Sequence, residues 1–286
     1  MSIRKILVPI TGGPHDGEVL AMALDVAKIF KAQMVALFAR ADPTEALPYL
    51  GEGVSGQVIE NLLDAAREGA EIASSKASKA LAAAASAAGV PIVEKSDNPV
   101  MPSARFVDVV GRRDDVVTAH SRLSDLVVFA EAEDTSAGGS SLEAALMSAD
   151  RPVLIVPKTR KPTIGTRIAI GWDQSQEASM AVTAAVPFLS HATQVTIFCI
   201  GNSELDTGPC AMLSDYLALH GVKPEIHLVD GQGRPDGEVL LDQAEKMSAD
   251  LLVMGGYGHS RLRQFFLGGT TQHVRSHATI PVLMAH

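Results

Sequence analysis

Small residues surround one short segment near the end of the chain, GGYGHSRLRQFFLGGTT at residues 255–271. Six of them flank its basic and aromatic centre: Gly255, Gly258, Gly268, Gly269, Thr270 and Thr271. Glycine lets a backbone adopt left-handed conformations and lets a ligand approach closely. Glycines that open a helix would direct free N–H groups at an anion. The pattern therefore raises the hypothesis that this segment holds the phosphates of a nucleotide.

Asp173 ends an earlier apolar strand pattern, IAIGWDQS, about 80 residues before the glycine-rich segment. An ionised carboxylate only accepts hydrogen bonds, so Asp173 suits a ribose hydroxyl or an adenine amino group. Ligands of α/β proteins bind at the carboxyl ends of the strands, where we expect these two segments to meet. In the alternative interpretation, Asp173 is the N-cap of a helix at 175–190, because Asp and Ser favour helix starts and Glu177 suits the first turn.

The centre of the glycine-rich segment is basic and aromatic. His259, Arg261 and Arg263 add positive character that would attract a phosphate, although they are equally readable as solvated loop charges. Phe265 and Phe266 are interpreted as core packing rather than as a platform for a base.

Two histidines four residues apart, His273 and His277, have a spacing that can hold a metal. No cysteine or acidic residue is obviously placed to complete the site, so a solvated helix face is favoured and no metal is predicted. The sequence has no Walker A lysine signature, no nucleophile elbow and no H-E-x-x-H or C-x-x-C motif. We therefore assign no catalytic residue and expect a protein that is not an enzyme.

Composition narrows the class of protein. The 286 residues are 47% hydrophobic and carry a net charge of −9 without a long basic run, so a nucleic-acid partner is not expected. No apolar run approaches the roughly 18 residues of a membrane span, and the N-terminus does not have the pattern of a signal peptide. A soluble cytoplasmic protein is the expectation. Its two cysteines, Cys199 and Cys210, are too few for a disulfide framework, and Cys199 is interpreted as a buried small hydrophobe.

Three segments recur in the same order in the two parts of the chain. RKILVPITGGPHDGEVLAMALDVA (4–27) resembles TRIAIGWDQSQEASMAVTAAVPFL (166–189), SDLVVFA (124–130) resembles ADLLVMG (249–255), and RPVLIVP (151–157) resembles IPVLMAH (280–286). The repeat predicts two copies of one domain, at 1–157 and 167–286, joined by a linker at 158–166.

Apolar runs alternate with helical patterns in the second copy. Strands are expected near 167–171, 194–200, 224–229, 250–255 and 280–284, and helices near 175–190, 210–220, 236–248 and 266–277. This alternation is typical of an α/β fold, with an open, mostly parallel five-stranded sheet and helices on both faces in each copy. The first copy adds an insertion near 41–60 and a long alanine-rich helix over about 57–88, which Gly89 ends.

The chain resembles a tandem universal stress protein across both copies, apart from the insertion. Nucleotide-binding members of that family carry G-x2-G-x9-G-[S/T] after the fourth strand, and Gly255, Gly258 and Gly268 fit this spacing. Gly269 stands where Ser or Thr is usual, with two threonines next. The family also has an aspartate at the end of the first strand, matched by Asp173, that contacts the adenine and ribose side of ATP.

The resemblance implies Rossmann-like or flavodoxin-like domains that associate through their last strands, RPVLIVP and IPVLMAH, as an intramolecular pseudo-dimer. It is also compatible with a homodimer of two such chains. It implies that the second copy binds ATP, either with or without Mg²⁺. The implied role is stress-linked binding and signalling through an unknown protein partner, without a defined chemical turnover.

The first copy departs from the family pattern. Its first strand ends in Thr11 instead of an aspartate, and Ala130 and Glu133 replace the first two glycines, while Gly139 keeps the third. Glu131 adds a negative charge that would repel a triphosphate. We predict that this copy does not bind ATP and serves as structure or as a partner surface.

Two alternatives to a binding and signalling role stay open. One is an enzyme that slowly hydrolyses ATP or transfers an adenylyl or phosphoryl group at the same pocket. The other is a nucleotide-free interaction protein, in which Gly269 has cost the site its affinity.

Overall fold

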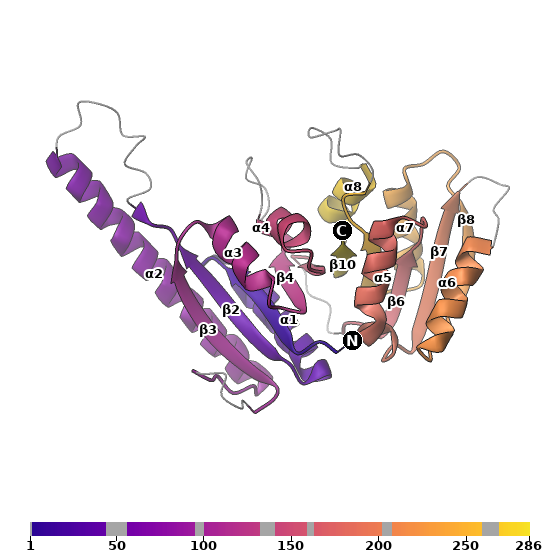
Figure 1. Ribbon diagram of the computed structural model, residues 1–286, viewed down its shortest axis with the longest axis horizontal. Helices are drawn as coiled ribbons and strands as arrows, with labels where there is room; N and C mark the ends of the chain where they lie inside the picture. The colour runs from indigo at the N-terminus through magenta and orange to yellow at the C-terminus, as the bar shows by residue number, and fades with distance from the viewer. Residues whose placement is uncertain are drawn as a thin grey trace.

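Ten strands form one continuous sheet in the computed structural model, which describes residues 2–43, 56–94, 100–131, 141–158, 163–201, 208–258 and 269–286. The strand order is β3-β2-β1-β4-β5-β10-β9-β6-β7-β8 (Figure 1). Strands of residues 1–157, here called the first half, occupy one side of this sheet. Strands of residues 167–286, the second half, occupy the other.

The first half alternates strands and helices along the chain. Its elements are β1 (Lys5–Ile10), α1 (Asp16–Phe30), β2 (Gln33–Arg40), α2 (Gly56–Ala88), β3 (Ser103–Val110), α3 (Arg113–Ser121), β4 (Leu126–Ala130), α4 (Ser141–Glu143), the π-helical turn η3 (Ala144–Ser148) and β5 (Val153–Val156). Its neighbouring strands all pair in parallel.

The second half repeats this order. Its elements are β6 (Arg167–Gly171), α5 (Gln176–Leu189), β7 (Gln194–Gly201), α6 (Gly208–Leu219), β8 (Glu225–Asp230), α7 (Asp236–Lys246), β9 (Leu251–Gly255), α8 (Gly269–His277) and β10 (Val282–Ala285). Its strands are also parallel, with β6 at the centre between β9 and β7.

Helices cover both faces of the sheet. One apolar layer packs α1, α2, α5 and α6 against it, and the other packs α3, η3, α7 and α8. The central strands β4, β5 and β10 are buried along their whole length, because a sheet covered on both faces hides every side chain. The predicted α/β fold with mostly parallel sheets is confirmed.

The two halves meet through their last strands. β5 and β10 pair antiparallel, with Leu154 opposite Leu283, which is the contact that the resemblance implied. Phe30 of α1 and Phe188 of α5 add an edge-to-face ring contact at 4.8 Å across the same junction. Both chain ends lie near it (Figure 1). The division into two domains with a linker at 158–166 stays a prediction, since one sheet runs through both halves.

Sequence periodicity placed the elements of the second half closely. The helix expected near 266–277 is described from Gly269 onward, and the other boundaries lie within two residues of the expected ones. In the first half, the alanine-rich helix ends as expected. Gly89 follows α2 with a φ of +66°, and the N–H of Val90 bonds the carbonyl of Ala85, as at helix ends closed by a left-handed glycine.

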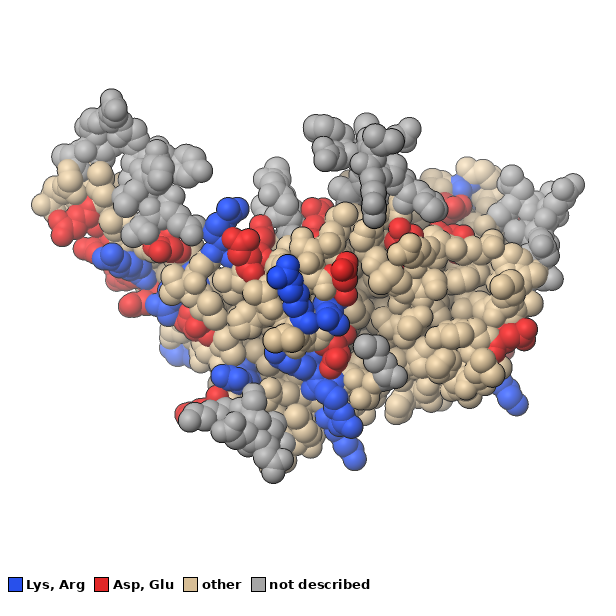
Figure 2. All heavy atoms as spheres, viewed as in Figure 1, with Lys and Arg blue, Asp and Glu red and all other residues tan. Residues whose placement is uncertain are grey.

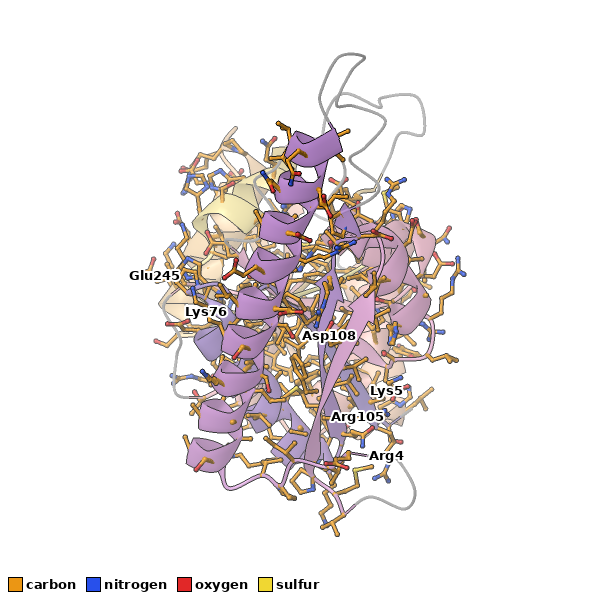
Figure 3. The ribbon with its side chains drawn as sticks, turned by 90° about the vertical axis from the view of Figure 1, so that its left-hand side faces the viewer. Arg4, Lys5, Lys76, Arg105, Asp108 and Glu245 are labelled. Carbon is orange, nitrogen blue, oxygen red and sulfur yellow. A yellow bond between two sulfur atoms is a disulfide. The ribbon has the colours of Figure 1, made fainter. Side chains whose placement is uncertain are left out.

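Helix α2 is packed along only part of its length. Its buried residues all lie in its second part: Ser74, Ala77, Leu81 and Ala85. The helix stands beside β3 and extends past it (Figure 3). Asp108 of β3 links them, since its Oδ2 accepts hydrogen bonds from the Ser74 hydroxyl and from Arg40 of β2, both at 2.5 Å.

This link predicts a pH dependence of stability. Burial raises the pKa of Asp108, but hydrogen bonds from Arg40 and Ser74 outweigh it and leave the pKa below its ordinary value. The stabilisation is therefore present above the unfolded-state pKa of about 3.9 and is lost as pH falls through the lower folded-state pKa. We expect Asp108→Asn to unfold at lower urea concentration than wild type at pH 6, with the difference shrinking below pH 4. A difference that is constant from pH 6 to pH 3 would contradict this assignment.

Charges of both signs are interspersed over the first half on the face in Figure 2, while the second half shows mainly uncharged surface there. Within the described ranges, the helices are too short or too polar to traverse a lipid bilayer.

Candidate functional site

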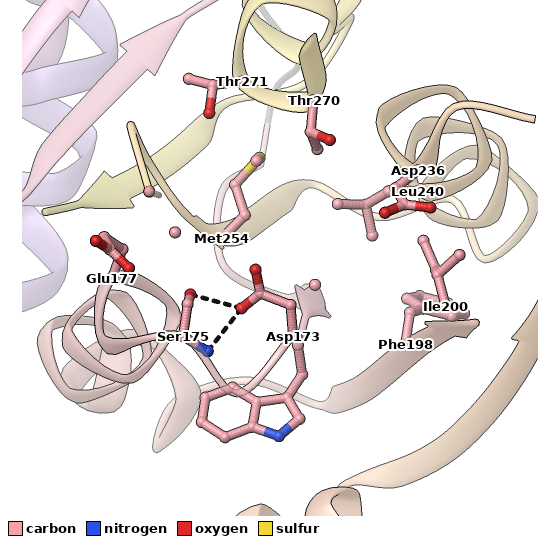
Figure 4. Close-up of a pocket in the computed structure, with 14 residues that line it drawn as sticks. Asp173, Ser175, Glu177, Phe198, Ile200, Asp236, Leu240, Met254, Thr270 and Thr271 are labelled. Carbon is pink, nitrogen blue, oxygen red and sulfur yellow. Dashed lines mark hydrogen bonds between the residues drawn. The ribbon is translucent and has the colours of Figure 1, made fainter. Parts of the chain in front are cut away.

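A cavity opens at the carboxyl ends of β6, β7 and β9, where ligands bind open α/β sheets (Figure 4). Its apolar lining consists of Phe198, Ile200, Leu240 and Met254, together with Trp172. The cavity volume is about 180 Å³. Small-molecule sites usually span roughly 300–1,000 Å³. A ligand of ordinary size would therefore be enclosed only in part by this cavity.

Five of the predicted binding residues line this cavity: Asp173, Gly255, Gly258, Thr270 and Thr271. Gly269 opens α8 and is exposed, and among the described residues outside its own helix no atom lies within 4 Å of the point where a side chain would begin. Gly268 lies outside the described residues, as do His259, Arg261 and Arg263. The structure thus joins the two motifs that lie far apart in the sequence.

Asp173 follows β6, and its carboxylate points into the cavity (Figure 4). Its Oδ1 accepts hydrogen bonds from the Ser175 backbone N–H at 2.9 Å and from the Ser175 hydroxyl at 2.6 Å. Ser175 is the N-cap of α5, since its Oγ accepts the N–H of Ala178 at 3.1 Å. The alternative in which Asp173 itself caps this helix is therefore wrong. Asp173 fixes the capping residue and turns its second oxygen toward the cavity.

Space, and not backbone conformation, explains the first two glycines. A Cβ on Gly255 would lie 2.7 Å from the backbone nitrogen of Ala178, and one on Gly258 would lie 3.2 Å from Oε2 of Glu177. Neither glycine has a positive φ; the left-handed positions at these strand ends belong to Gln174 and Tyr257, with φ of 64° and 61°. A left-handed role for the two glycines is therefore wrong. The backbone of the first turn of α5 leaves no room for a side chain at Gly255, whereas at Gly258 the flexible side chain of Glu177 would have to move.

The start of α8 forms the side of the cavity opposite Asp173 (Figure 4). Thr270 lines the rim, and Thr271 is buried with its Oγ1 accepting the N–H of Tyr257 at 3.3 Å. That bond ties the glycine segment to the helix. The first N–H groups of any helix have no intrahelical acceptor and carry positive potential, so this end of α8 suits an anion.

Two further carboxylates line the cavity and were not predicted. Glu177 lies in the first turn of α5, and Asp236 is the first residue of α7. Glu177 Oε2 is buried without a hydrogen-bond partner in the described part of the chain. With Asp173 they form three acidic groups, and no Lys or Arg is among the described residues of the lining. Their position in the sequence could have identified them, because helices that follow parallel strands begin at this edge of the sheet.

The corresponding region of the first half is filled by its own side chains. Asp16 accepts the backbone N–H of Thr11 at 3.2 Å and that of Gly12 at 2.8 Å. Burial raises the pKa of Asp16 despite these bonds. Arg113 donates to the Ile10 carbonyl at 3.1 Å and to the Ser141 hydroxyl at 3.1 Å. Groups at the end of β1 therefore bond within the protein, and the lack of ATP binding here stays a prediction.

The two histidines of α8 stack on each other, with ring centroids 4.3 Å apart. Nδ1 of His277 lies 2.9 Å from the backbone carbonyl oxygen of His273. Over the described ranges, no three His, Cys, Asp or Glu residues are arranged to hold a metal ion.

Comparison with known proteins finds similarity to universal stress proteins. Residues 201–286 match the model of the Universal stress protein family. A universal stress protein of Synechocystis sp. is 27% identical over 250 residues, which covers 82% of this chain and 80% of that protein. The resemblance stated from the sequence motifs is confirmed.

Solved structures share the fold over nearly the whole chain. A universal stress protein from Archaeoglobus fulgidus aligns with a TM-score of 0.70 and 17% identity, over 98% of this chain and 97% of that one. A functionally unknown protein from Pseudomonas aeruginosa aligns with a TM-score of 0.59 and 16% identity, over 98% and 92%.

Proposed function

Because this chain is similar to universal stress proteins over 82% of its length, we propose that it is an adenine-nucleotide-binding protein of stress response and signalling, with ATP bound in the second half. The observation that carries the proposal is the meeting of Asp173, Gly258 and the start of α8 at one cavity. Each supplies a different part of what a nucleotide requires.

The cavity suits a nucleotide in a defined orientation. Asp173 would accept a hydrogen bond from a ribose hydroxyl or the adenine amino group. The apolar floor, which includes the ring of Phe198, would pack against the base, since aromatic faces stack on nucleobases. The phosphates would then extend past Gly258 to the start of α8, where free N–H groups favour anions.

The three carboxylates of the lining set a condition on this ligand. A bare triphosphate beside Asp173, Glu177 and Asp236 would be repelled. Mg²⁺ is commonly held by one or two carboxylates together with substrate phosphates, which fits this donor set. We therefore infer that ATP binds as its Mg²⁺ complex, with the ion carried mainly by the phosphates and its chemistry limited to neutralising them.

Calorimetric titration of ATP with Mg²⁺ tests the proposal. We expect saturable binding at one site per chain, weakened about tenfold or more in Asp173→Ala because a charge-assisted hydrogen bond contributes roughly 1.5–3 kcal/mol. Thr11→Ala is the matched control, since Thr11 holds the same position in the first half. It should leave the affinity unchanged. A folded wild type without saturable binding would favour the nucleotide-free interaction protein.

Gly269→Ser is expected to tighten ATP binding by about threefold to tenfold. The position is exposed and its φ is not positive. No described atom outside α8 lies within 4 Å of the point where the Cβ of a new side chain would stand. A serine hydroxyl there can donate to a phosphate oxygen, as the usual Ser or Thr of the family pattern would. Gly269→Ala serves as the control, because it adds the Cβ without the hydroxyl. Equal affinities of the two variants would show that the hydroxyl contributes nothing.

One observation favours slow ATP hydrolysis as a second candidate function. Glu177 Oε2 is a buried acceptor without a partner in the described part of the chain, and it lies on the side of Gly258 where the phosphates would extend. Such an oxygen can orient a water molecule toward a phosphorus atom. Loss of ADP formation in Glu177→Gln, with ATP affinity retained, would support this function.

A further inference from the structure

The two cysteines of the chain form a disulfide beside the cavity. Cys199 lies in β7 and Cys210 in the first turn of α6, 11 residues apart in sequence. Both are buried, with 7% and 2% of their surface exposed. Cys199 is buried as expected, but its interpretation as simply a small hydrophobe is wrong, because it is bonded to Cys210. The bond joins α6 covalently to the strand that forms one wall of the cavity.

Strand geometry places this bond directly behind the cavity wall. Side chains alternate between the faces of a strand, so the neighbours of Cys199 point to the opposite face. Those neighbours are Phe198 and Ile200, and both line the cavity. Cys199 packs in the apolar layer on the side of α6, whereas Phe198 packs in the other layer. Breaking the disulfide would therefore affect the positions of Phe198 and Ile200 in the cavity wall.

A second connection runs through Trp172. Its Nε1 donates a hydrogen bond to the carbonyl oxygen of Pro209 at 3.3 Å. Pro209 precedes Cys210, and Trp172 precedes Asp173 in the cavity lining. The start of α6 is thus held at two points, by the disulfide to β7 and by this hydrogen bond to the segment that presents Asp173.

We propose that Cys199 and Cys210 are a reversible thiol–disulfide site that regulates nucleotide affinity in the second half. The regulatory part rests on the proposed function, whereas the redox site itself does not. In the disulfide form, the start of α6 is fixed and Trp172 and Phe198 are held as the cavity requires. Reduction frees this turn from β7, so that the arrangement competent for binding is populated less of the time.

The chemistry balances with a peroxide as oxidant. One cysteine thiolate attacks hydrogen peroxide and becomes a sulfenic acid, and the hydroxide that leaves takes up the proton lost by that thiol to give water. The other thiol then attacks the sulfenic sulfur and releases a second water. Two thiols and one peroxide thus give one disulfide and two waters. The reverse step takes two electrons from a dithiol through a mixed disulfide, with the two protons returning to the cysteine sulfurs. Opening of the first turn of α6 would admit either reagent, since helix ends fray.

The chain contains a single tryptophan, so its fluorescence reports on this site alone. We would prepare the full chain oxidised with hydrogen peroxide and reduced with dithiothreitol, remove each reagent, and count free thiols after denaturation. We expect none in the first sample and two in the second, with a shifted Trp172 emission on reduction. Two thiols in the peroxide-treated sample would overturn the redox site, and identical spectra in both states would overturn its connection to Trp172.

Titration of both samples with ATP and Mg²⁺ tests the regulation. We expect affinity about threefold to tenfold weaker after reduction, because the apparent dissociation constant rises as the competent fraction falls. The Cys199→Ser, Cys210→Ser double variant should bind like the reduced protein and ignore peroxide. Equal affinity of the two forms would overturn the regulation while leaving the proposed function intact. Absence of binding in both forms would instead remove the proposed function, and the thiol count would still decide the redox site.

Discussion

Gly258→Asp is expected to weaken binding of ATP with Mg²⁺ by about 100-fold. The new side chain would start 3.2 Å from Oε2 of Glu177, on the path we propose for the phosphates. The carboxylate of the new aspartate and a phosphate of ATP would repel each other. At a separation of about 5–6 Å and an effective dielectric constant near 20, this repulsion is about 3 kcal/mol, which corresponds to roughly two orders of magnitude in affinity. Glu177 is a flexible side chain and can move aside, so the fold should survive this substitution.

Gly258→Asn separates charge from size in this experiment. Asparagine has nearly the same shape as aspartate without the negative charge, and we expect it to cost about tenfold or less. Calorimetry of both variants would be accompanied by thermal unfolding to show that they are folded. If aspartate and asparagine weakened binding equally, the phosphates would not pass Gly258, and the orientation proposed for the nucleotide would have to be reversed.

Gly255→Ala is expected to lower the free energy of unfolding by about 2–3 kcal/mol. A methyl group there would lie 2.7 Å from the backbone nitrogen of Ala178 and 3.0 Å from the carbonyl carbon of Glu177. These are backbone atoms in the capped first turn of α5, which cannot move aside as a side chain can. Overpacking of this kind typically costs 1–3 kcal/mol. Chemical unfolding in urea, with the slope compared between variants, would measure the loss.

The same substitution at the start of α8 is the matched control for Gly255→Ala. Gly269→Ala places a methyl group where no described atom outside α8 lies within 4 Å, and alanine favours helix over glycine by about 1 kcal/mol. We expect this variant to be as stable as wild type or more stable. If the two substitutions lowered stability equally, the cost would come from losing glycine itself and not from contact with α5.

Sequence patterns were enough to predict which segments are strands and helices and at which end of the sheet the candidate site lies. Runs such as LVVFA in β4 and LLVMG in β9 are short, rich in β-branched or large apolar residues and flanked by turn signals, which favours buried strands of a covered parallel sheet. Asp173 and Gly258 meet because parallel strands end at the same edge of the sheet. The shared edge follows from parallel strands alone, whereas the direct contact also requires β6 and β9 to be neighbours in the sheet, which the structure shows.

Only the tertiary structure decided what each of these residues touches. Three contacts depend on how α5 is set against the neighbouring strand. Ser175 caps α5, the backbone of Ala178 leaves no room for a side chain at Gly255, and Glu177 faces Gly258. The same holds for the contact of Cys199 with Cys210, since both read locally as buried residues. Hydrophobic periodicity indicates that a face is buried, but it carries no information about the partner across the interface, and that partner is what sets the chemistry of the cavity.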